Sequence, residues 1–233
     1  HKKSPTSNIN IRKAIQAAIN ADEIMASAIP NPNFRVIDPS LYPPESAYYN
    51  FAKGELYNQN DPEKAKEYLK KAGYNNERIT FQAISTNAFM TRIGVALVGQ
   101  LKKAGMNAEL LSYERQTWSQ KRRDGNALMM YNSGGNWIDP SLYQPEFTGT
   151  FPSVETAFSD PEVDEVFKLL NEETDKLKRI KHGKRLQSLF LEKVATYSFG
   201  HWYKMIAKRS NVVDTEGNLS LGNLTLNNVG LSK

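Results

Sequence analysis

The side chains that could carry out chemistry do not form a catalytic pattern in this sequence. The three histidines, His1, His182 and His201, lack the spacing of a metal site. Cysteine is absent, which excludes thiol catalysis, disulfide bonds and zinc sites built on cysteine. The motifs of serine hydrolases, zinc proteases, P-loop enzymes and dinucleotide-binding folds are absent as well. The sequence therefore predicts neither an enzyme nor a protein with a metal or organic cofactor.

Two weaker features also have ordinary structural interpretations. Paired carboxylates, which could act as a general acid and a general base, occur at Glu172 with Glu173 and at Asp160 with Asp164. Helix surfaces carry many such pairs, so we interpret them as solvated side chains. The stretch NSGGNW, residues 132–137, follows an apolar segment and could cradle an anion with its backbone N–H groups. Two glycines are equally typical of a turn.

Charge and composition indicate a globular chain without a nucleic-acid partner. The net charge is +5, from 30 Lys and Arg against 25 Asp and Glu, and the densest basic cluster is residues 176–185. Leu177 and Ile180 alternate there with lysines at helical spacing, which favours a solvated helix face over a phosphate-binding patch. With 39% hydrophobic residues and no apolar run of about 18, the sequence predicts no membrane span.

Two helix ends carry the same pentapeptide, LKKAG, at residues 69–73 and 101–105. The helix before the first copy opens with Asp61, a suitable N-cap, and with Pro62 at the first helical position. The two lysines fall in the last turn, where cations suit the helix dipole, and the glycine can take the left-handed conformation of a Schellman motif. No third copy exists, so we interpret LKKAG as a stop signal used twice and not as a repeat.

Each stop is followed by a short apolar segment typical of a strand, at residues 78–85 and 107–113, and a third lies at 127–133. Helical patterns at 88–104 and 115–123 separate them. The alternation predicts an α/β fold with a mostly parallel sheet, flanked by helices that form right-handed crossovers. Ligands of such sheets bind beyond the carboxyl ends of the strands.

The flanking segments complete the expected order of elements. We expect one long helix over residues 10–29, capped by Ser7 or Asn8, and a Pro-, Tyr- and Asn-rich excursion over 30–60 that packs on the domain surface. Two helices should follow the capping sequence Asp160-Pro161, and the stretch from residue 199 to 210 could be a strand. The tail from Val212 has no clear periodicity.

The order of these motifs resembles a known family. The segments NIRKAIQAAINADEIM, YNQNDPEKAKEYLKKAGY, LVGQLKKAGMNAELL and ALMMYNSGGNWIDPSLY, with the closing helix pair, resemble the family-5 solute-binding proteins of ABC importers. That family includes dipeptide, oligopeptide and nickel binders, and its members are longer and have two lobes. The resemblance implies that residues 1–211 form the second, C-terminal lobe, which is periplasmic-binding-protein-like. It also implies that residues 212–233 are a tail returning to a first lobe absent from this chain.

The resemblance implies a function as well. Such a protein captures peptides or peptide-like solutes in the periplasm or at the outer face of the cytoplasmic membrane. It delivers them to the permease subunits of an ABC transporter. We expect a monomer, peripheral to the membrane, with no enzymatic activity and no cofactor.

The ligand contacts that the resemblance implies lie in the three strand-end segments. They are Thr86, Tyr113, Arg115, Asn132, Ser133, Gly134, Asn136 and Trp137. Asn136 stands where peptide-binding members have an aspartate that holds the peptide's amino terminus, and Arg115 stands where dipeptide binders carry a tryptophan. The sequence near Thr86 contains no arginine that could bind a carboxylate of the ligand. We expect Asp139, which precedes Pro140, to be a capping or turn residue.

Three alternatives remain open at this point. Within the same family, the solute could be an opine, a sugar or a metal chelate. Outside it, an α/β enzyme would need a perturbed nucleophile or acid–base pair in a deep pocket. A chaperone-like interaction module would instead present a contiguous basic or apolar patch.

Overall fold

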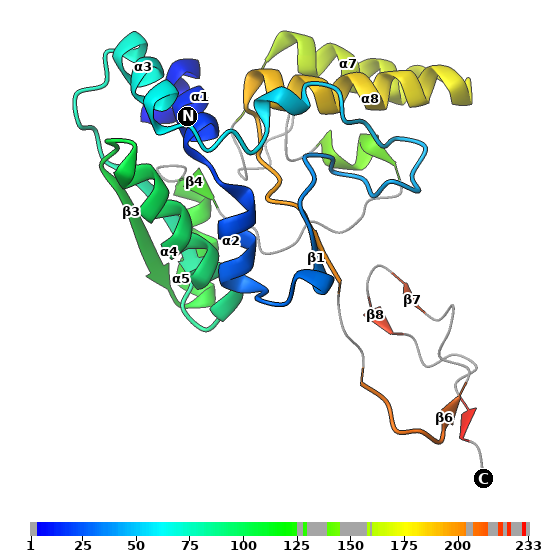
Figure 1. The fold of residues 1–233 in the computed structure, drawn as a ribbon. Coiled ribbons are helices and arrows are strands. Elements are labelled where there is room, and N and C mark those ends of the chain that lie inside the picture. The colour runs from blue at the N-terminus through cyan, green and yellow to red at the C-terminus, as the bar shows by residue number, and fades with distance from the viewer. Residues whose placement is uncertain are drawn as a thin grey trace.

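The computed structural model describes residues 4–124, 128–129, 139–144, 158, 160–203, 207–213, 219–220, 223–224 and 230–231. Its centre is a three-stranded parallel sheet of order β3-β2-β4, built from β2 (Ile79–Ile84), β3 (Ala108–Tyr113) and β4 (Leu128–Met129). The crossovers are α4 (Ala88–Lys103) and α5 (Arg115–Asp124). The predicted α/β fold, with neighbouring parallel strands and these two crossovers, is confirmed. Figure 1 shows β3 and β4 with α4 and α5 beside them.

Both LKKAG segments end helices in the predicted way. The helix α3 (Pro62–Ala72) is capped by the Asp61 side chain, which accepts from the Lys64 amide, and stops at Gly73 with φ 66°. The Tyr74 amide then donates to the Leu69 carbonyl at 3.0 Å. At the end of α4, Gly105 has φ 85° and the Met106 amide donates to the Leu101 carbonyl at 3.0 Å. These are two Schellman motifs built by one pentapeptide.

The single long helix expected at residues 10–29 is wrong. The chain forms α1 (Ile9–Ala18) and α2 (Ala21–Ala28), separated by Ile19 and Asn20 in extended conformations. Asn8 caps α1, as predicted, but Asn20 caps α2 through the Glu23 amide. The Asn20 amide is satisfied by the Gln100 side chain on α4, at 3.0 Å. This long-range hydrogen bond stabilises the break between α1 and α2. The apolar helical periodicity of the sequence continues across the break and does not predict it.

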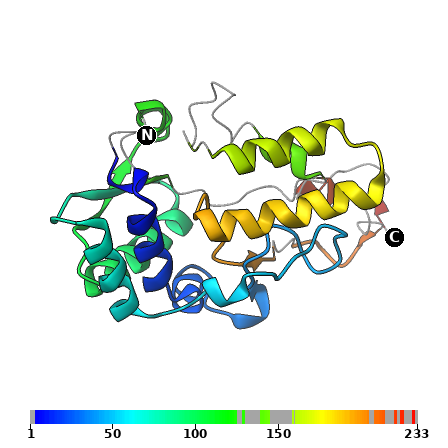
Figure 2. The same cartoon turned by 90° about the horizontal axis from the view of Figure 1, so that it is seen from above.

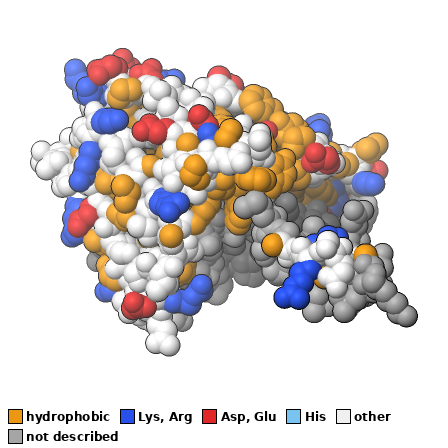
Figure 3. Space-filling model, turned by 60° about the horizontal axis from the view of Figure 1, so that its bottom comes forward, with side chains coloured by type: hydrophobic (Ala, Val, Ile, Leu, Met, Phe, Trp, Pro, Cys, Tyr) orange, Lys and Arg blue, Asp and Glu red, His pale blue; other side chains and the backbone are white. Residues whose placement is uncertain are grey.

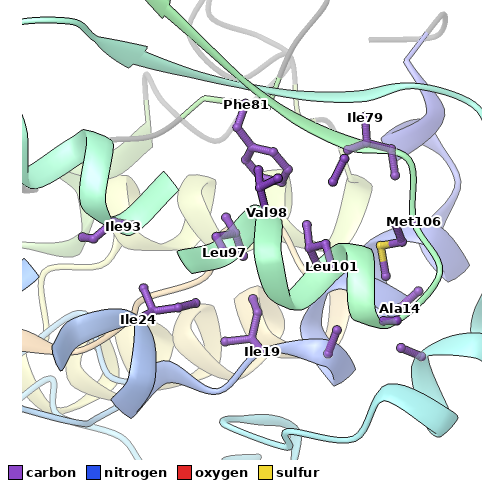
Figure 4. Close-up of a cluster of buried hydrophobic side chains, with 14 of the residues drawn as sticks. Ala14, Ile19, Ile24, Ile79, Phe81, Ile93, Leu97, Val98, Leu101 and Met106 are labelled. Carbon is purple, nitrogen blue, oxygen red and sulfur yellow. The ribbon is translucent and has the colours of Figure 1, made fainter. Parts of the chain in front are cut away.

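The larger hydrophobic cluster lies between the sheet and the first helices. α1 packs against α3, and α2 packs against α4. Figure 4 shows side chains of α4 and β2 on one side meeting those of the α1–α2 region on the other. Ile19, Ile24, Ile79, Leu101 and their neighbours are almost completely buried. This cluster fixes β2 and α4, the two elements that position the turn between them.

A second hydrophobic cluster surrounds the closing helices α7 (Pro161–Glu172) and α8 (Lys176–Lys193), which pack against each other. Figure 2 shows this pair beside the sheet region. Asp160 caps α7 with its side chain, as predicted. The excursion over residues 30–60 contains η2 (Pro32–Phe34), β1 (Arg35–Val36) and η3 (Gly54–Leu56). It contributes Tyr42 to the second cluster and Tyr57 to the first, so it joins both cores and is more than a surface covering.

The last described elements are short. The predicted strand within residues 199–210 is only β5 (His201–Trp202), which pairs antiparallel with β1. Beyond it, β6 (Val212–Val213) pairs with β9 (Gly230–Leu231), and β7 (Leu219–Ser220) pairs with β8 (Asn223–Leu224). Figure 1 shows β6, β7 and β8 apart from the parallel sheet. The assignment of residues 212–233 to a returning tail, and of 1–211 to one lobe, stays a prediction.

Candidate functional site

The turns that follow β2 and β3 lie side by side at the carboxyl edge of the sheet. In the register of the two strands Ile84 is opposite Tyr113, and the Ser85 amide continues the ladder by donating to the Tyr113 carbonyl at 2.8 Å. One residue further, the Ser85 hydroxyl contacts Glu114 Oε1 at 3.3 Å. The strand pairing therefore brings together Thr86, Tyr113 and Arg115, three of the residues predicted as ligand contacts.

These three side chains differ in their exposure. Thr86 and Arg115 are exposed, and Tyr113 is half-buried with its ring against the first cluster. The turn that follows β2 carries no arginine of its own, and parallel pairing puts the Arg115 turn next to it. The sequence predicts both turns at this edge of the sheet. A hydroxyl and a guanidinium in adjoining turns can bind a carboxylate or another polar acceptor of a solute.

The amino terminus of α4 begins at the same edge. Asn87 is its N-cap, and its side chain accepts from the Met90 amide at 3.1 Å. The Thr91 hydroxyl donates back to the Asn87 carbonyl at 3.1 Å. The positive end of the α4 dipole therefore lies next to Thr86, which favours a negative or dipolar group there.

The third strand-end segment holds the other predicted contacts. β4 pairs parallel with β2, with Leu128 opposite Phe81 and Met129 opposite Gln82, so it points toward the same edge. Asn132, Ser133, Gly134, Asn136 and Trp137 lie outside the described residues. Their contact with a ligand stays a prediction. Within the part of the chain that the structure describes, no group of carboxylates and histidines could hold a metal ion.

Asp139 is a cap, as the sequence predicts. It caps η4 (Pro140–Tyr143) by accepting from the Ser141 amide at 2.9 Å and the Ser141 hydroxyl at 2.7 Å. Arg179 on α8 donates to both of its carboxylate oxygens, at 2.8 and 2.7 Å. Burial alone would raise the pKa of Asp139, but the hydrogen bonds from Ser141 and Arg179 hold that pKa below its usual value. The chain that follows the third segment is thus fixed to α8.

Aromatic side chains near this edge escaped the sequence analysis. Phe89, in the first turn of α4, and Trp202, in β5, have ring centroids 5.5 Å apart. Trp202 is 39% exposed and the adjacent Tyr203 is 60% exposed. Figure 3 views the molecule from the side toward which the strands point and shows hydrophobic side chains gathered between scattered charges. The one available signal was the aromatic pair in GHWYK, which we interpreted only as part of a possible strand.

Comparison with known proteins decides the family. Residues 1–153 match the family described as bacterial extracellular solute-binding proteins, family 5 Middle. The chain belongs to this family. Family-5 solute-binding proteins are binding proteins for transport and not enzymes, which confirms that prediction. Among the described residues no helix combines the length and the apolar character that crossing a bilayer requires.

Curated relatives of the family-5 chain differ in their ligands. The Nickel-binding periplasmic protein of Escherichia coli (strain K12) is 26% identical over 155 residues, which are 60% of this chain and 29% of that protein. The Dipeptide-binding protein DppE of Bacillus subtilis (strain 168) is 26% identical over 187 residues, 75% of this chain and 34% of that protein. The chain thus spans about a third of the length of these relatives.

Solved structures share the fold. A putative peptide binding protein AppA from Clostridium difficile has a TM-score of 0.79 at 20% identity, covering 97% of this chain and 48% of that one. A dipeptide binding protein from Pseudoalteromonas sp. SM9913, in complex with Met-Leu, has a TM-score of 0.78 at 22% identity, covering 97% and 46%. The predicted fold of a periplasmic binding protein is therefore confirmed.

Proposed function

We propose that this chain is part of the substrate-binding component of an ABC importer that captures peptides or peptide-like solutes. The observation that carries the proposal is the convergence of polar side chains from separate turns at one carboxyl edge of a family-5 sheet. This is where open α/β sheets bind ligands. Relatives described as dipeptide-binding and as a probable peptide ABC transporter periplasmic-binding protein support the peptide class.

In this proposal the solute binds outside the cytoplasmic membrane, in the periplasm or at the outer face of that membrane. The partners are the solute and the permease subunits of the transporter. The protein acts as a monomer, peripheral to the membrane, and binds no nucleic acid. Thr86, Tyr113 and Arg115 contact the solute, together with Asn132, Ser133, Gly134, Asn136 and Trp137 of the third segment.

A non-peptide solute of the same family is the second candidate. Two observations favour it: one relative is described as nickel-binding, and one solved neighbour is in complex with agropinic acid. An exposed arginine beside the positive end of α4 also suits an acidic solute without a free amino group. Mass spectrometry of solutes that co-purify with the protein as its gene encodes it distinguishes the two candidates.

A charge change at Asn136 tests the peptide assignment. A carboxylate both accepts a hydrogen bond from an ammonium and neutralises it, whereas an amide only accepts. We expect Asn136→Asp to shift preference toward peptides with a free amino terminus over their N-acetylated forms. Calorimetry with matched free and acetylated peptides measures the ratio. An unchanged ratio would show that Asn136 does not face the solute.

A further inference from the structure

Two aromatic rings from distant parts of the chain meet beside the strand-end turns. Phe89 and Trp202 are separated by more than a hundred residues, yet their ring planes are inclined by 38° at a centroid distance of 5.5 Å. Phe89 follows Thr86 by three residues in the turn that opens α4. The ring pair therefore adjoins the polar side chains of the proposed site.

The backbone around Trp202 is held against the β1 segment. Trp202 is opposite Arg35 in the β1–β5 pair, and the next amide, that of Tyr203, donates to the Phe34 carbonyl at 3.0 Å. Gly200 has φ +127°, and a Cβ there would lie 2.2 Å from the Val36 carbonyl oxygen. Only glycine permits this close approach of the two strands.

The partner strand is anchored in turn. Arg35 donates to the carbonyls of Ile29 and Pro30, at 3.0 and 2.9 Å. Those residues directly follow α2, which packs against α4. Because α4 also carries Phe89, the two rings belong to one connected frame. A ring positioned in this way loses little conformational entropy when a ligand stacks on it.

Trp202 is a large ring that is fixed in position and yet partly exposed to solvent. Phe89 is half-buried and packs against the first cluster, so it supports the tryptophan from behind. Trp202 keeps 39% of its surface in solvent. Large aromatic rings that are rigid and partly exposed are typical of binding surfaces, because they add contact area at low entropic cost.

We propose that Trp202, backed by Phe89, is a subsite for an aromatic or planar apolar group of the bound solute. The inference rests on the proposed function, in which Thr86, Tyr113 and Arg115 take the polar part of the same molecule. The solute would then combine a polar or acidic group with an aromatic ring, as a dipeptide with a phenylalanine side chain does. The solute ring would lie offset on the indole, or edge to face with it, as aromatic pairs in proteins do.

Calorimetry with two dipeptides, Gly-Phe and Gly-Ala, tests the subsite in the protein as its gene encodes it. We expect Trp202→Ala to weaken Gly-Phe binding at least about tenfold, since both ring contact and buried area are lost. Gly-Ala binding should change less than about twofold. Trp202→Phe should keep most of the affinity for Gly-Phe. The matched control is Phe51→Ala, which removes another exposed ring, 54% in solvent, from the excursion near α8.

The possible results separate this inference from the proposed function. If the unaltered protein binds both dipeptides and Trp202→Ala weakens both equally or neither, the subsite is wrong and the peptide assignment stands. If it binds neither dipeptide, the peptide assignment is wrong. Saturation-transfer NMR with indole then decides the subsite alone. A signal present in the unaltered protein and in Phe51→Ala but lost in Trp202→Ala supports it, and equal signals in all three overturn it.

Discussion

The two hydrophobic clusters are held together by different chemistry. Around the sheet, α1 to α4 bury the larger apolar cluster, and three buried glutamines lie on its elements: Gln16, Gln82 and Gln100. Around α7 and α8 the apolar cluster is smaller, and buried polar residues surround it: Asp38, Ser40, Gln187 and Ser188. An apolar core depends mainly on volume, whereas a buried polar contact depends on both partners being present. The second region should therefore be the more sensitive to single polar substitutions.

Gln187 and Gln82 form a matched pair for this comparison, because each is a buried glutamine, one in each region. Gln187 Oε1 accepts from the Ser40 hydroxyl at 2.7 Å and from the Leu41 amide at 2.9 Å. Its amide group donates to the Tyr48 carbonyl. In β2, the side-chain oxygen of Gln82 is buried and has no hydrogen-bond partner among the residues that the structure describes.

We expect the largest effect from Gln187→Met, which keeps the volume and leaves several buried polar groups unpaired. The free energy of unfolding should fall by about 3 kcal/mol. Gln82→Met should leave it within about 0.5 kcal/mol, or raise it, because it removes an unsatisfied polar atom. Urea unfolding followed by circular dichroism measures both. Equal losses would show that the two regions do not differ in the proposed way.

The next effect concerns Arg179, which ties the second region to the chain that leaves the candidate site. Its guanidinium binds Asp139 and also donates to the carbonyls of Leu170 and Glu173 at the end of α7. Arg179→Met should lower the free energy of unfolding by about 2 kcal/mol at neutral pH. The half-buried carboxylate of Asp139 and the carbonyls at the end of α7 would lose the guanidinium that binds them. Arg179→Lys should recover part of this, since an ammonium cannot bind both oxygens as a fork.

The pH dependence of that loss has a definite sign. Asp139 has a lowered pKa in the folded protein, so its contribution is complete above the pKa of an unfolded aspartate, about 3.9. The contribution is lost as the pH falls through the folded pKa. The stability difference between the unaltered protein and Arg179→Met should therefore shrink below about pH 4. A difference that is constant from pH 7 to pH 3 would contradict the assignment to Asp139.

The sequence predicts the features that depend on local interactions and misses those that depend on distant residues. Asp61, Asn8, Asp160 and the two glycines of LKKAG act within a few residues of themselves, so a local pattern is sufficient to place them. The break at Asn20 depends on Gln100, eighty residues away, and no local pattern contains it.

The candidate site divides in the same way. Parallel pairing and the strand ends predict that the Thr86 and Arg115 turns are neighbours in space, once the fold class is known. The position of Trp202 depends on a two-residue strand whose partner is Arg35. A strand of two residues is too short to show an alternating hydrophobic pattern in the sequence. The position of Trp202 beside Phe89 is therefore evident only in three dimensions.

The two LKKAG stops allow a comparison within the first region. Gly73 and Gly105 have φ values of 66° and 85°, and a Cβ on either would meet nothing within 4 Å. An alanine at either position would therefore be strained only in its backbone conformation. We expect each Gly→Ala substitution to lower the free energy of unfolding by about 1 kcal/mol. Thermal unfolding of both variants measures it. A clearly larger loss at Gly105 would show that the more buried helix end adds packing strain to the shared backbone cost.

The smallest expected effect comes from the basic run on α8, the same run that holds Arg179. Lys176, Lys178 and Lys181 are exposed, and their one ion pair in the described part of the chain is that of Lys178 with Glu173 at 3.9 Å. An exposed pair at that distance contributes little. Replacing all three lysines by glutamine should therefore change the free energy of unfolding by less than about 0.5 kcal/mol.

The same triple replacement should also leave binding to a heparin column at 150 mM salt unchanged, since a solvated helix face makes no specific phosphate contacts. A marked loss of heparin binding would instead identify a polyanion site, because releasing counterions from three phosphate contacts has a large salt-dependent effect. Charge alone therefore does not set the contribution of a residue in this run: two residues from Lys181, Arg179 stabilises the fold because its partner carboxylate is fixed and partly buried.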